Sequence, residues 1–419
     1  MASASSGEID ALVENAVFGA DAVRESSRQK IRQLASKQGI VPSSIAGLYE
    51  AAGKRLYSGV TVPAINIRGM TYPVARAVFR AALKDKVGPF IFEIARSEID
   101  YTAQRPDEYA TCILAAALRE GFGGPVFLQG DHFQVNIARY NSDPQQELDN
   151  IKELVREAVS AGFFNIDIDA STIVDLEKSS LEEEQEKNYQ VTADMTRFIR
   201  EVEPDGITIS VGGEIGEVGG RNSTPADLKA FMTGYLRLLG SDVRGLSKIS
   251  VQTGTSHGGV VLPDGSIASV SIAFDTLKEL SREAREKYGM GGAVQHGAST
   301  LPDDAFDLFP GADTLEVHLA TGFQNIIFDS PYFPKELTDT ISRHLQDKYA
   351  DEMKQGDTVE QFLYKTRKKA FGDFKKEIWG LPAENLREIG NALEERFSLL
   401  FHKLKVDDTV DLVNRFVNH

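Results

Sequence analysis

Short apolar runs alternate with longer segments of helical periodicity through the middle of the chain. Eight runs are rich in β-branched and aromatic residues, and they begin at Val60, Gly88, Gly124, Phe163, Gly206, Ser247, Gly291 and Asp313. The segments between them place apolar residues three and four positions apart, which indicates amphipathic helices. Strands separated by helices pair in parallel, and eight such units over about 265 residues predict an α/β fold, a (β/α)8 TIM barrel.

Both ends of the chain have helical patterns and lack strand-like runs. We therefore predict an N-terminal helical extension over residues 1–59, a barrel over residues 60–330 and a C-terminal helical extension over residues 331–419. The last extension carries aromatic residues, such as Phe371 and Trp379, at helical spacing. Such a stripe favours packing or a subunit contact over a cofactor site, so we expect a homo-oligomer. No glycine-rich phosphate-binding turn follows the first run, which argues against a nucleotide-binding fold.

Composition and charge narrow the classes of partner. The chain has 419 residues, 26% of them charged, and a formal net charge of −16, which argues against a nucleic-acid partner because binding to phosphate backbones needs clustered Lys and Arg. The longest apolar run, CILAAAL from Cys112, is too short to cross a membrane. A single cysteine and an N-terminus without a secretion signal predict a cytoplasmic protein, and we expect a small-molecule substrate.

Four of the seven histidines fall near the carboxyl ends of predicted strands, where barrel enzymes build their active sites. His132 ends the third run, His257 follows the sixth, His296 ends the seventh and His318 lies on the eighth. Three neutral imidazoles from separate strands leave a tetrahedral Zn²⁺ with one open position, and Mn²⁺ or Co²⁺ can use the same ligands. The alternative is that these are separate histidines that only hydrogen-bond to loops.

Six motifs follow one another in the strand order of a known family. They are VPAINI, GDHF, IDAS, GGEIGEVGG, TSHGG and QHGAST, and they span roughly residues 60–330. In this order they resemble the class II, zinc-dependent fructose-bisphosphate aldolases and their ketose-bisphosphate relatives. The resemblance implies an enzyme that makes and breaks the C3–C4 bond of a ketose or ketose phosphate through a metal-stabilised enediolate.

The same resemblance implies roles for individual residues. Asp131 would be the general base and acid at the C4 hydroxyl. The zinc ligands would be His132, His257 and His296. The catalytic glutamate of the fifth strand would be Glu214, with Glu217 as an alternative. Asn66 would contact the substrate, and Gly258, Gly297 and Ser299 would hold a substrate phosphate.

The chain departs from the family pattern in three places. Gln129 replaces the histidine that usually begins the HxDH motif. The eighth strand reads EVHLAT, so His318 stands where the family has a substrate-contacting aspartate. The loop after the fifth strand offers Arg221 in place of a proton-transferring glutamate. The metal ligands are therefore expected to be kept, while the residues around the substrate differ.

These departures leave two alternatives to a plain aldolase. A retro-aldol step followed by attack on the other face of the aldehyde would invert C4, which makes the protein a ketose 4-epimerase. Its proton carriers would be Asp131 and either His318 or Glu93, which ends the second strand. The other alternative is a non-catalytic accessory subunit of a tagatose-bisphosphate aldolase, although Asp131 and all three candidate ligands are present.

Three arginines could bind an anionic group of the substrate. Arg68 and Arg96 follow the first and second strands, and Arg221 follows the fifth. A guanidinium group matches the geometry of phosphate or carboxylate. Each of these arginines is equally typical of an ion pair within the protein, and the sequence leaves phosphate and carboxylate open.

Overall fold

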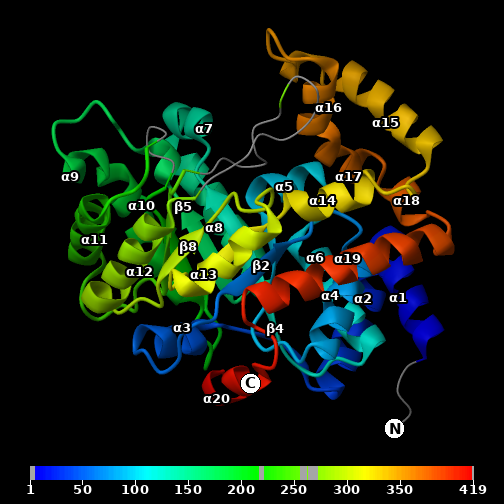
Figure 1. The fold of residues 1–419 in the computed structure, drawn as a ribbon, viewed down its shortest axis with the longest axis horizontal. Coiled ribbons are helices and arrows are strands. Elements are labelled where there is room, and N and C mark those ends of the chain that lie inside the picture. Colours follow the sequence, from blue (N-terminus) through cyan, green and yellow to red (C-terminus); the bar gives the residue numbers. More distant parts are fainter. Residues whose placement is uncertain (1–4, 217–220, 255–261, 263–271, 418–419) are drawn as a thin grey trace.

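The computed structural model describes residues 5–216, 221–254, 262 and 272–417. Eight parallel strands, β2 to β9, close into a barrel that is surrounded by helices (Figure 1). The strands follow the order β4-β3-β2-β9-β8-β7-β6-β5, and a pairing between β4 and β5 closes the ring. The predicted (β/α)8 barrel with helical extensions is confirmed.

Each barrel strand overlaps one of the eight predicted runs. The strands are β2 (Val62–Asn66), β3 (Ile91–Ala95), β4 (Gly124–Gln134), β5 (Asn165–Asp169), β6 (Ser210–Glu214), β7 (Lys248–Val251), β8 (Ala293–Gln295) and β9 (Glu316–Leu319). Seven of them are buried along their whole length. Helices cover the outside and side chains fill the inside, so the polar residues of these strands are buried along with the apolar ones.

Helices follow the strands and form the outer layer. They are α4 (Thr71–Lys84), α5 (Arg96–Tyr101), α6 (Pro106–Glu120), α7 (Ile137–Ser142), α8 (Pro144–Ala161), α9 (Leu181–Glu184), α10 (Glu186–Val202), α11 (Pro225–Leu239), α12 (Phe274–Tyr288), α13 (Leu308–Gly311) and α14 (Thr321–Phe328). Helix α8 begins where Asp143 accepts a hydrogen bond from the backbone of Gln146 and ends at Gly162. This glycine has a φ of 97°, as expected for a left-handed helix cap.

The N-terminal extension contains a strand that the sequence pattern did not predict. It consists of α1 (Ser6–Phe18), α2 (Asp21–Lys37), β1 (Ile40–Ser43) and α3 (Ala46–Gly53). The expectation that this extension lacks strands is therefore wrong. β1 pairs in parallel with the first residues of β4, whereas β4 meets β5 only from Gln129 onward. The strand forms because this edge of β4 offers it hydrogen bonds, which is a tertiary effect.

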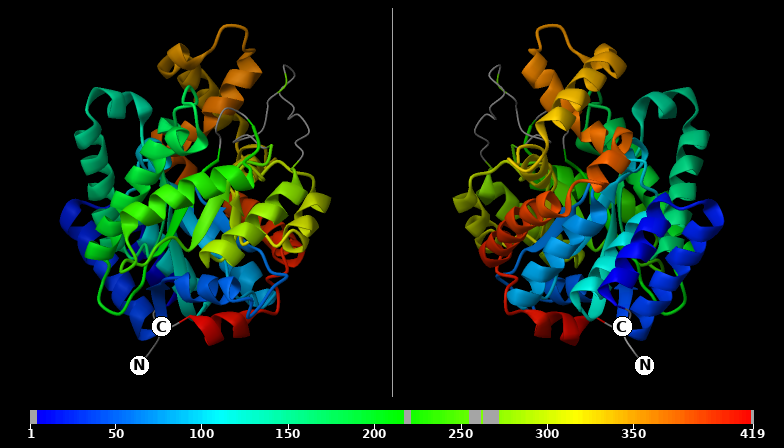
Figure 2. Two further views of the ribbon diagram at one scale, coloured as in Figure 1. Left: turned by 90° about the vertical axis from the view of Figure 1, so that its left-hand side faces the viewer. Right: turned by 90° about the vertical axis from the view of Figure 1, so that its right-hand side faces the viewer.

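The C-terminal extension is helical and wraps along the barrel. Its helices are α15 (Lys335–Lys348), α16 (Val359–Thr366), α17 (Ala370–Asp373), α18 (Lys375–Trp379), α19 (Ala383–Lys403) and α20 (Val410–Phe416). Figure 2 shows α15 and α16 at one end of the molecule and α20 at the opposite end. Between them α19 packs against α4, and α20 contacts α3. Within the described part of the chain, no helix combines the length and apolarity needed to cross a membrane.

Candidate active site

A cavity of about 260 Å³ lies where the barrel strands end. It is lined by ten of the residues singled out from the sequence, namely Asn66, Arg68, Glu93, Asp131, His132, Glu214, His296, Gly297, Ser299 and His318. Two further candidates, His257 and Gly258, lie outside the described residues, as does Glu217. Polar groups from strands far apart in the sequence therefore meet in one hollow, as in other barrel enzymes.

A bulge in β4 brings Asp131 and His132 to the same cavity. In a regular strand two neighbouring side chains point to opposite faces. Here the register between β4 and β5 shifts between Gly130 and Phe133, and His132 has a φ of 40°. A bulge of this kind redirects a side chain, so both adjacent residues line the cavity.

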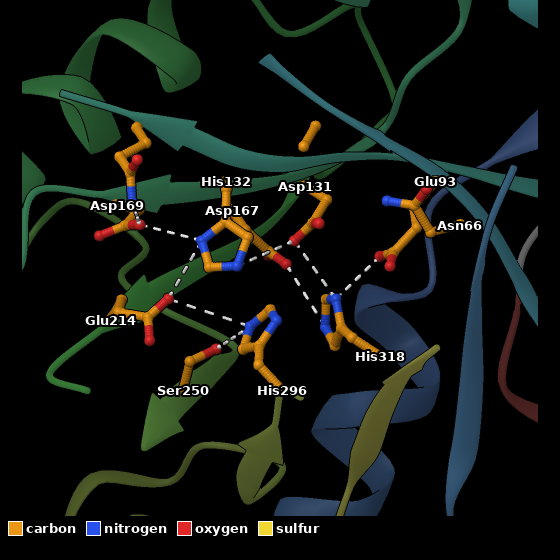
Figure 3. A network of polar contacts seen from close by, with 12 residues as sticks. Asn66, Glu93, Asp131, His132, Asp167, Asp169, Glu214, Ser250, His296 and His318 are labelled. Atoms are coloured by element: carbon orange, nitrogen blue, oxygen red, sulfur yellow. Dashed lines mark hydrogen bonds and ion pairs between the residues drawn. The ribbon is translucent and has the colours of Figure 1, made fainter. Parts of the chain in front are cut away.

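Carboxylates surround the His132 imidazole (Figure 3). Its Nδ1 lies 2.9 Å from Asp169 Oδ2 and 3.4 Å from Glu214 Oε2, and its Nε2 lies 3.9 Å from Asp131 Oδ1. Asp169 also accepts a hydrogen bond from the Ser171 hydroxyl, at 2.7 Å. Burial alone would lower the pKa of His132, but the carboxylates, Asp131 foremost, raise the pKa well above its usual range. A hydrogen bond of this kind, donated by the imidazole N–H to a carboxylate, orients the ring for metal binding.

His296 follows β8 and stacks beside His132. The two ring centroids lie 4.3 Å apart, and His296 Nε2 is 3.1 Å from the Ser250 hydroxyl oxygen and 3.9 Å from Glu214 Oε2. Glu214 therefore faces both imidazoles. Burial, with the Asp169 carboxylate adding to it, raises the pKa of Glu214 to about 8, so near neutral pH this group can donate a proton.

His318 lies on the other side of His296. Its ring centroid is 3.9 Å from that of His296. Its Nδ1 lies 2.9 Å from Glu93 Oε2 and 3.3 Å from Asp131 Oδ1. Burial, with the Asp131 carboxylate adding to it, raises the pKa of Glu93 to about 7. Asp131, His318 and Glu93 therefore form one cluster of groups that can exchange protons.

Beneath the cavity, a buried lysine joins the strands. Lys248, at the start of β7, is 1% exposed, and its ammonium lies 2.9 Å from Asp167 Oδ2 and contacts Glu316 Oε1. It also donates to the Gln129 side-chain oxygen at 2.8 Å. On β6, a Cβ at Gly212 would lie 2.2 Å from Asp167 Oδ1, so only glycine leaves room for this ion pair.

Gln129 stands where the family has a histidine, and it binds this buried layer together. Its side-chain nitrogen donates to Glu93 at 3.0 Å and to Glu316 at 2.9 Å. An amide can donate and accept at once, which suits a position between Lys248 and two carboxylates. Gln129, which replaces the family's histidine, is therefore a hydrogen-bond partner of the buried Lys248.

Sequence reasoning assigned no role to Asp169, Asp167, Lys248 or Glu316. A signal was present, because each is a charged residue inside a run that otherwise has strand-like apolar character. Buried charges require partners. Here those partners come from other strands of the barrel and, for Glu316, also from Tyr49 of α3, and the sequence does not say which side chains meet.

The three candidate arginines differ in position. Arg68 lines the cavity, and its Nε donates to Glu98 Oε1 at 2.7 Å. Arg96 instead pairs with Glu147 and donates to the Gln134 carbonyl at 2.7 Å. Arg221 forms two 2.8 Å bonds to Asp227 and does not line the cavity. Of the three candidate arginines, only Arg68 lines the cavity.

The donor atoms fit a metal ion. Ligand atoms of Asp131, His132 and His296 lie within 4.8 Å of one another, and so do those of His132, Asp169 and Glu214. Imidazole nitrogens combined with carboxylate oxygens are the ligands that Zn²⁺ takes in catalytic sites. The metal dependence that is general in class II aldolases is thus compatible with the residues that this chain brings together.

Comparisons with solved structures agree with the barrel fold. Solved structures with the same fold include a putative fructose-1,6-bisphosphate aldolase from Coccidioides immitis (16% identity, 87% of this chain and 96% of the other, TM-score 0.51). Fructose-bisphosphate aldolase from Campylobacter jejuni matches at 17% identity over 88% and 97% of the two chains, with a TM-score of 0.52. Fructuronate-tagaturonate epimerase from Cohnella laeviribosi matches at 12% identity over 90% and 85%, with a TM-score of 0.58.

A search of curated proteins finds no match. The family model for fructose-bisphosphate aldolase class-II, in contrast, matches residues 47–377, which is most of the sequence. The chain therefore belongs to the class II fructose-bisphosphate aldolase family.

Proposed function

We propose that the protein is a zinc-dependent class II aldolase-type enzyme that makes and breaks the C3–C4 bond of a ketose or ketose phosphate. The bulge in β4 is the observation that most supports this proposal. Because of the bulge, the side chains of a candidate general base, Asp131, and a candidate metal ligand, His132, both point into one cavity. His296 joins them from β8. This combination of acid–base group and metal ligands is what cleavage next to a carbonyl needs.

In this proposal, His132 and His296 hold Zn²⁺, and His257 is the expected third ligand. When bound, the ion would polarise the substrate carbonyl and stabilise negative charge on the ketose fragment. Asp169 orients the His132 ring through its Nδ1, and Ser250 contacts the His296 ring. Such partners keep ligands in position before the metal arrives.

Asp131 would take the proton from the C4 hydroxyl as the C3–C4 bond breaks and return it in the reverse direction. Its Oδ1 lies 3.3 Å from His318 Nδ1, so the proton can be shared with the cluster that includes Glu93. Asn66 would bind a substrate hydroxyl. Its amide nitrogen donates to Glu98 at 2.7 Å, and its buried Oδ1 has no hydrogen-bond partner among the described residues.

A 4-epimerase is the second candidate function, and the arrangement of proton carriers supports it. Figure 3 shows His132 and His296 between two sets of titratable groups. Asp131 and His318 lie on one side, and Glu214 on the other. Asp131, His318 and Glu93 belong to one cluster. Glu214 is therefore a better candidate than His318 or Glu93 for the second proton carrier, on the face of the substrate opposite Asp131. Inversion at C4 requires such a second proton carrier.

Product analysis decides between the candidates. The zinc-loaded protein is incubated with fructose, tagatose and their phosphates, and the products are identified. A triose supports the aldolase, and a C4 epimer without free triose supports the epimerase. An isolated chain that neither binds zinc nor converts any of these sugars would contradict both, and would favour an accessory subunit. Light scattering of the same preparation tests the proposed homo-oligomer, and cell fractionation tests the proposed cytoplasmic location.

A further inference from the structure

One lysine of the C-terminal extension reaches the active-site cavity. Lys368 lies in the short 3-10 turn Arg367–Lys369, between α16 and α17, and it lines the same cavity as His132 and His296. Its ammonium lies 5.6 Å from the centre of the Tyr101 ring, within the range of a cation–π contact. The extension, which was expected only to pack or to make subunit contacts, therefore contributes a side chain to the site.

Close packing fixes the position of this lysine. Phe371, three residues further on, is 3% exposed, and α17 contacts α5. A Cβ at Gly372 would lie only 2.1 Å from the Tyr101 carbonyl oxygen, so the two backbones approach as closely as glycine allows. Lys375 then pairs with Glu108 and donates to the Ala103 carbonyl at 2.8 Å. Figure 1 shows this orange segment beside the barrel near α5 and α14.

Lys368 differs from neighbouring basic residues in its charge partners. Arg367 pairs with Asp329, and Lys369 pairs with Glu352. Lys368, in contrast, forms no ion pair with an acidic side chain of the described residues. Burial, with the nearby Arg68 adding to it, lowers the pKa of Lys368, as expected for a cation without a close anion.

One basic side chain that lines the cavity has no ion pair with a carboxylate of the described residues. Among the described residues that line it, only Arg68 and Lys368 carry a lysine or arginine charge, and Arg68 is already paired with Glu98. The parts of the chain outside the described residues contain no lysine or arginine. One uncompensated cation matches a carboxylate, with a single negative charge, better than a phosphate close to −2.

We propose that Lys368, assisted by Arg68, binds a terminal carboxylate of the substrate, so that the preferred substrate is a ketose acid rather than a phosphorylated or neutral ketose. This inference rests on the proposed C3–C4 chemistry for its choice of a ketose. The carboxylate would lie at the end of the sugar remote from the bond that breaks, where it fixes the orientation of C3 and C4 without taking part in proton transfer.

The test compares three ketoses that differ only at C6: fructose, fructuronate and fructose 6-phosphate. Dissociation constants are measured by calorimetry with the zinc-loaded protein, and product formation is followed separately. The wild type should prefer fructuronate. Lys368→Met should weaken fructuronate binding by roughly 10- to 100-fold, the range of a charge-assisted contact, and should leave fructose binding unchanged. Lys368→Arg should keep most of the preference.

Lys365→Met is the matched control, because Lys365 lies on α16, is exposed and pairs with Asp357 at 2.8 Å. It should alter none of the three constants. An unchanged preference for fructuronate in Lys368→Met would overturn the inference, and so would a stronger preference for fructose 6-phosphate in the wild type. If fructuronate binding depends on Lys368 but no cleavage or inversion occurs, the subsite stands and the proposed function is refuted. If turnover occurs and Lys368→Met has no effect, the proposed function stands and the subsite is refuted.

Discussion

At the level of single residues, the site depends on the directions in which a few side chains point. Asp131 and His132 are adjacent in sequence, and a positive φ at His132 lets both line one cavity. His296 and His318 come from two further strands, and their ring centroids lie 3.9 Å apart, with the ring planes tilted by 40°. The chemistry proposed for each residue can therefore be separated by single substitutions, because each has different contacts.

Asp131→Asn separates proton transfer from metal binding. The amide keeps the size of the carboxylate but cannot accept the C4 hydroxyl proton, so we expect zinc content and folding to be kept and turnover to fall by roughly 10²- to 10⁴-fold. Metal analysis and kcat measurement on one preparation check this. Asp194→Asn, an exposed carboxylate of α10 paired with Arg197, is the control. Loss of zinc from Asp131→Asn would instead make Asp131 a ligand.

His132→Ala tests the metal site itself. We expect this variant to lose most of its zinc on dialysis, because a ligand oriented by Asp169 and Glu214 is removed. Chelation of the wild type should abolish turnover, and added Zn²⁺ should restore it. His344→Ala serves as the control, since His344 lies in α15 and pairs with Asp373 at 2.9 Å, away from the cavity. Full zinc content in His132→Ala would refute the assignment.

At the scale of elements, loops and helix starts around the cavity are held by ion pairs. Glu147, on α8, is 1% exposed. It pairs with Arg96 at the start of α5 and accepts the backbone N–H of Asn136 at 2.8 Å. Arg96 was a candidate for substrate binding, but in this position it connects two βα loops. Its effect on the site is then to keep the end of β4 in place.

Glu147→Gln should make stability less dependent on pH. Burial opposes ionisation, but the Arg96 guanidinium and the Asn136 N–H outweigh it and lower the pKa of Glu147. A lowered folded-state pKa stabilises the fold fully above the unfolded value of about 4.3, and this contribution is lost as pH falls through the folded-state pKa.

We expect the Gln variant to be less stable than the wild type by about 1–3 kcal/mol at pH 7, and the difference to shrink below about pH 4. Urea unfolding at pH 7 and at pH 3.5 measures both. Glu153→Gln, on the exposed face of the same helix, should show neither effect. A difference between Glu147→Gln and wild type that persists at pH 3.5 would contradict the charge-based explanation.

At the scale of the whole molecule, the barrel is joined across its interior by charge as well as by apolar packing. Lys248 connects β7 with β5, β9 and β4 through Asp167, Glu316 and Gln129. The Lys248 ammonium offsets the burial of Glu316 and lowers the pKa of that carboxyl. The floor of the cavity is thus a buried ionic layer. Glu93 contacts it through Gln129, and His318 contacts it through Glu316.

Lys248→Met should destabilise the protein by about 3–5 kcal/mol, because two buried carboxylates lose their cation. Denaturant unfolding of the zinc-saturated proteins measures the change. Lys287→Met, which removes an exposed lysine paired with Glu283 on α12, should unfold like the wild type. Should Lys248→Met also unfold like the wild type, the buried layer would have to be neutral at pH 7 rather than ionic.

The eight barrel strands could be predicted from the sequence, because their signal is local: apolar β-rich runs lie between segments of helical periodicity. It also singled out His132 and His296, because each ends a predicted strand, where a barrel has its cavity. Asp131 and Glu214 were assigned their roles through the resemblance to the aldolase family. These residues were identifiable without knowing which strands face one another.

Features that depend on partners distant in sequence could not be predicted, because they form only when the chain folds. β1 is a strand because it pairs with the edge of β4. Its four residues are too few for their local β-propensity to predict a strand. The partners of Lys248, and the pairing of Arg96 with Glu147 instead of with a ligand, follow from which side chains meet after the barrel closes. Lys368 enters the cavity from the C-terminal extension because packing brings the two together, and no local pattern records that approach.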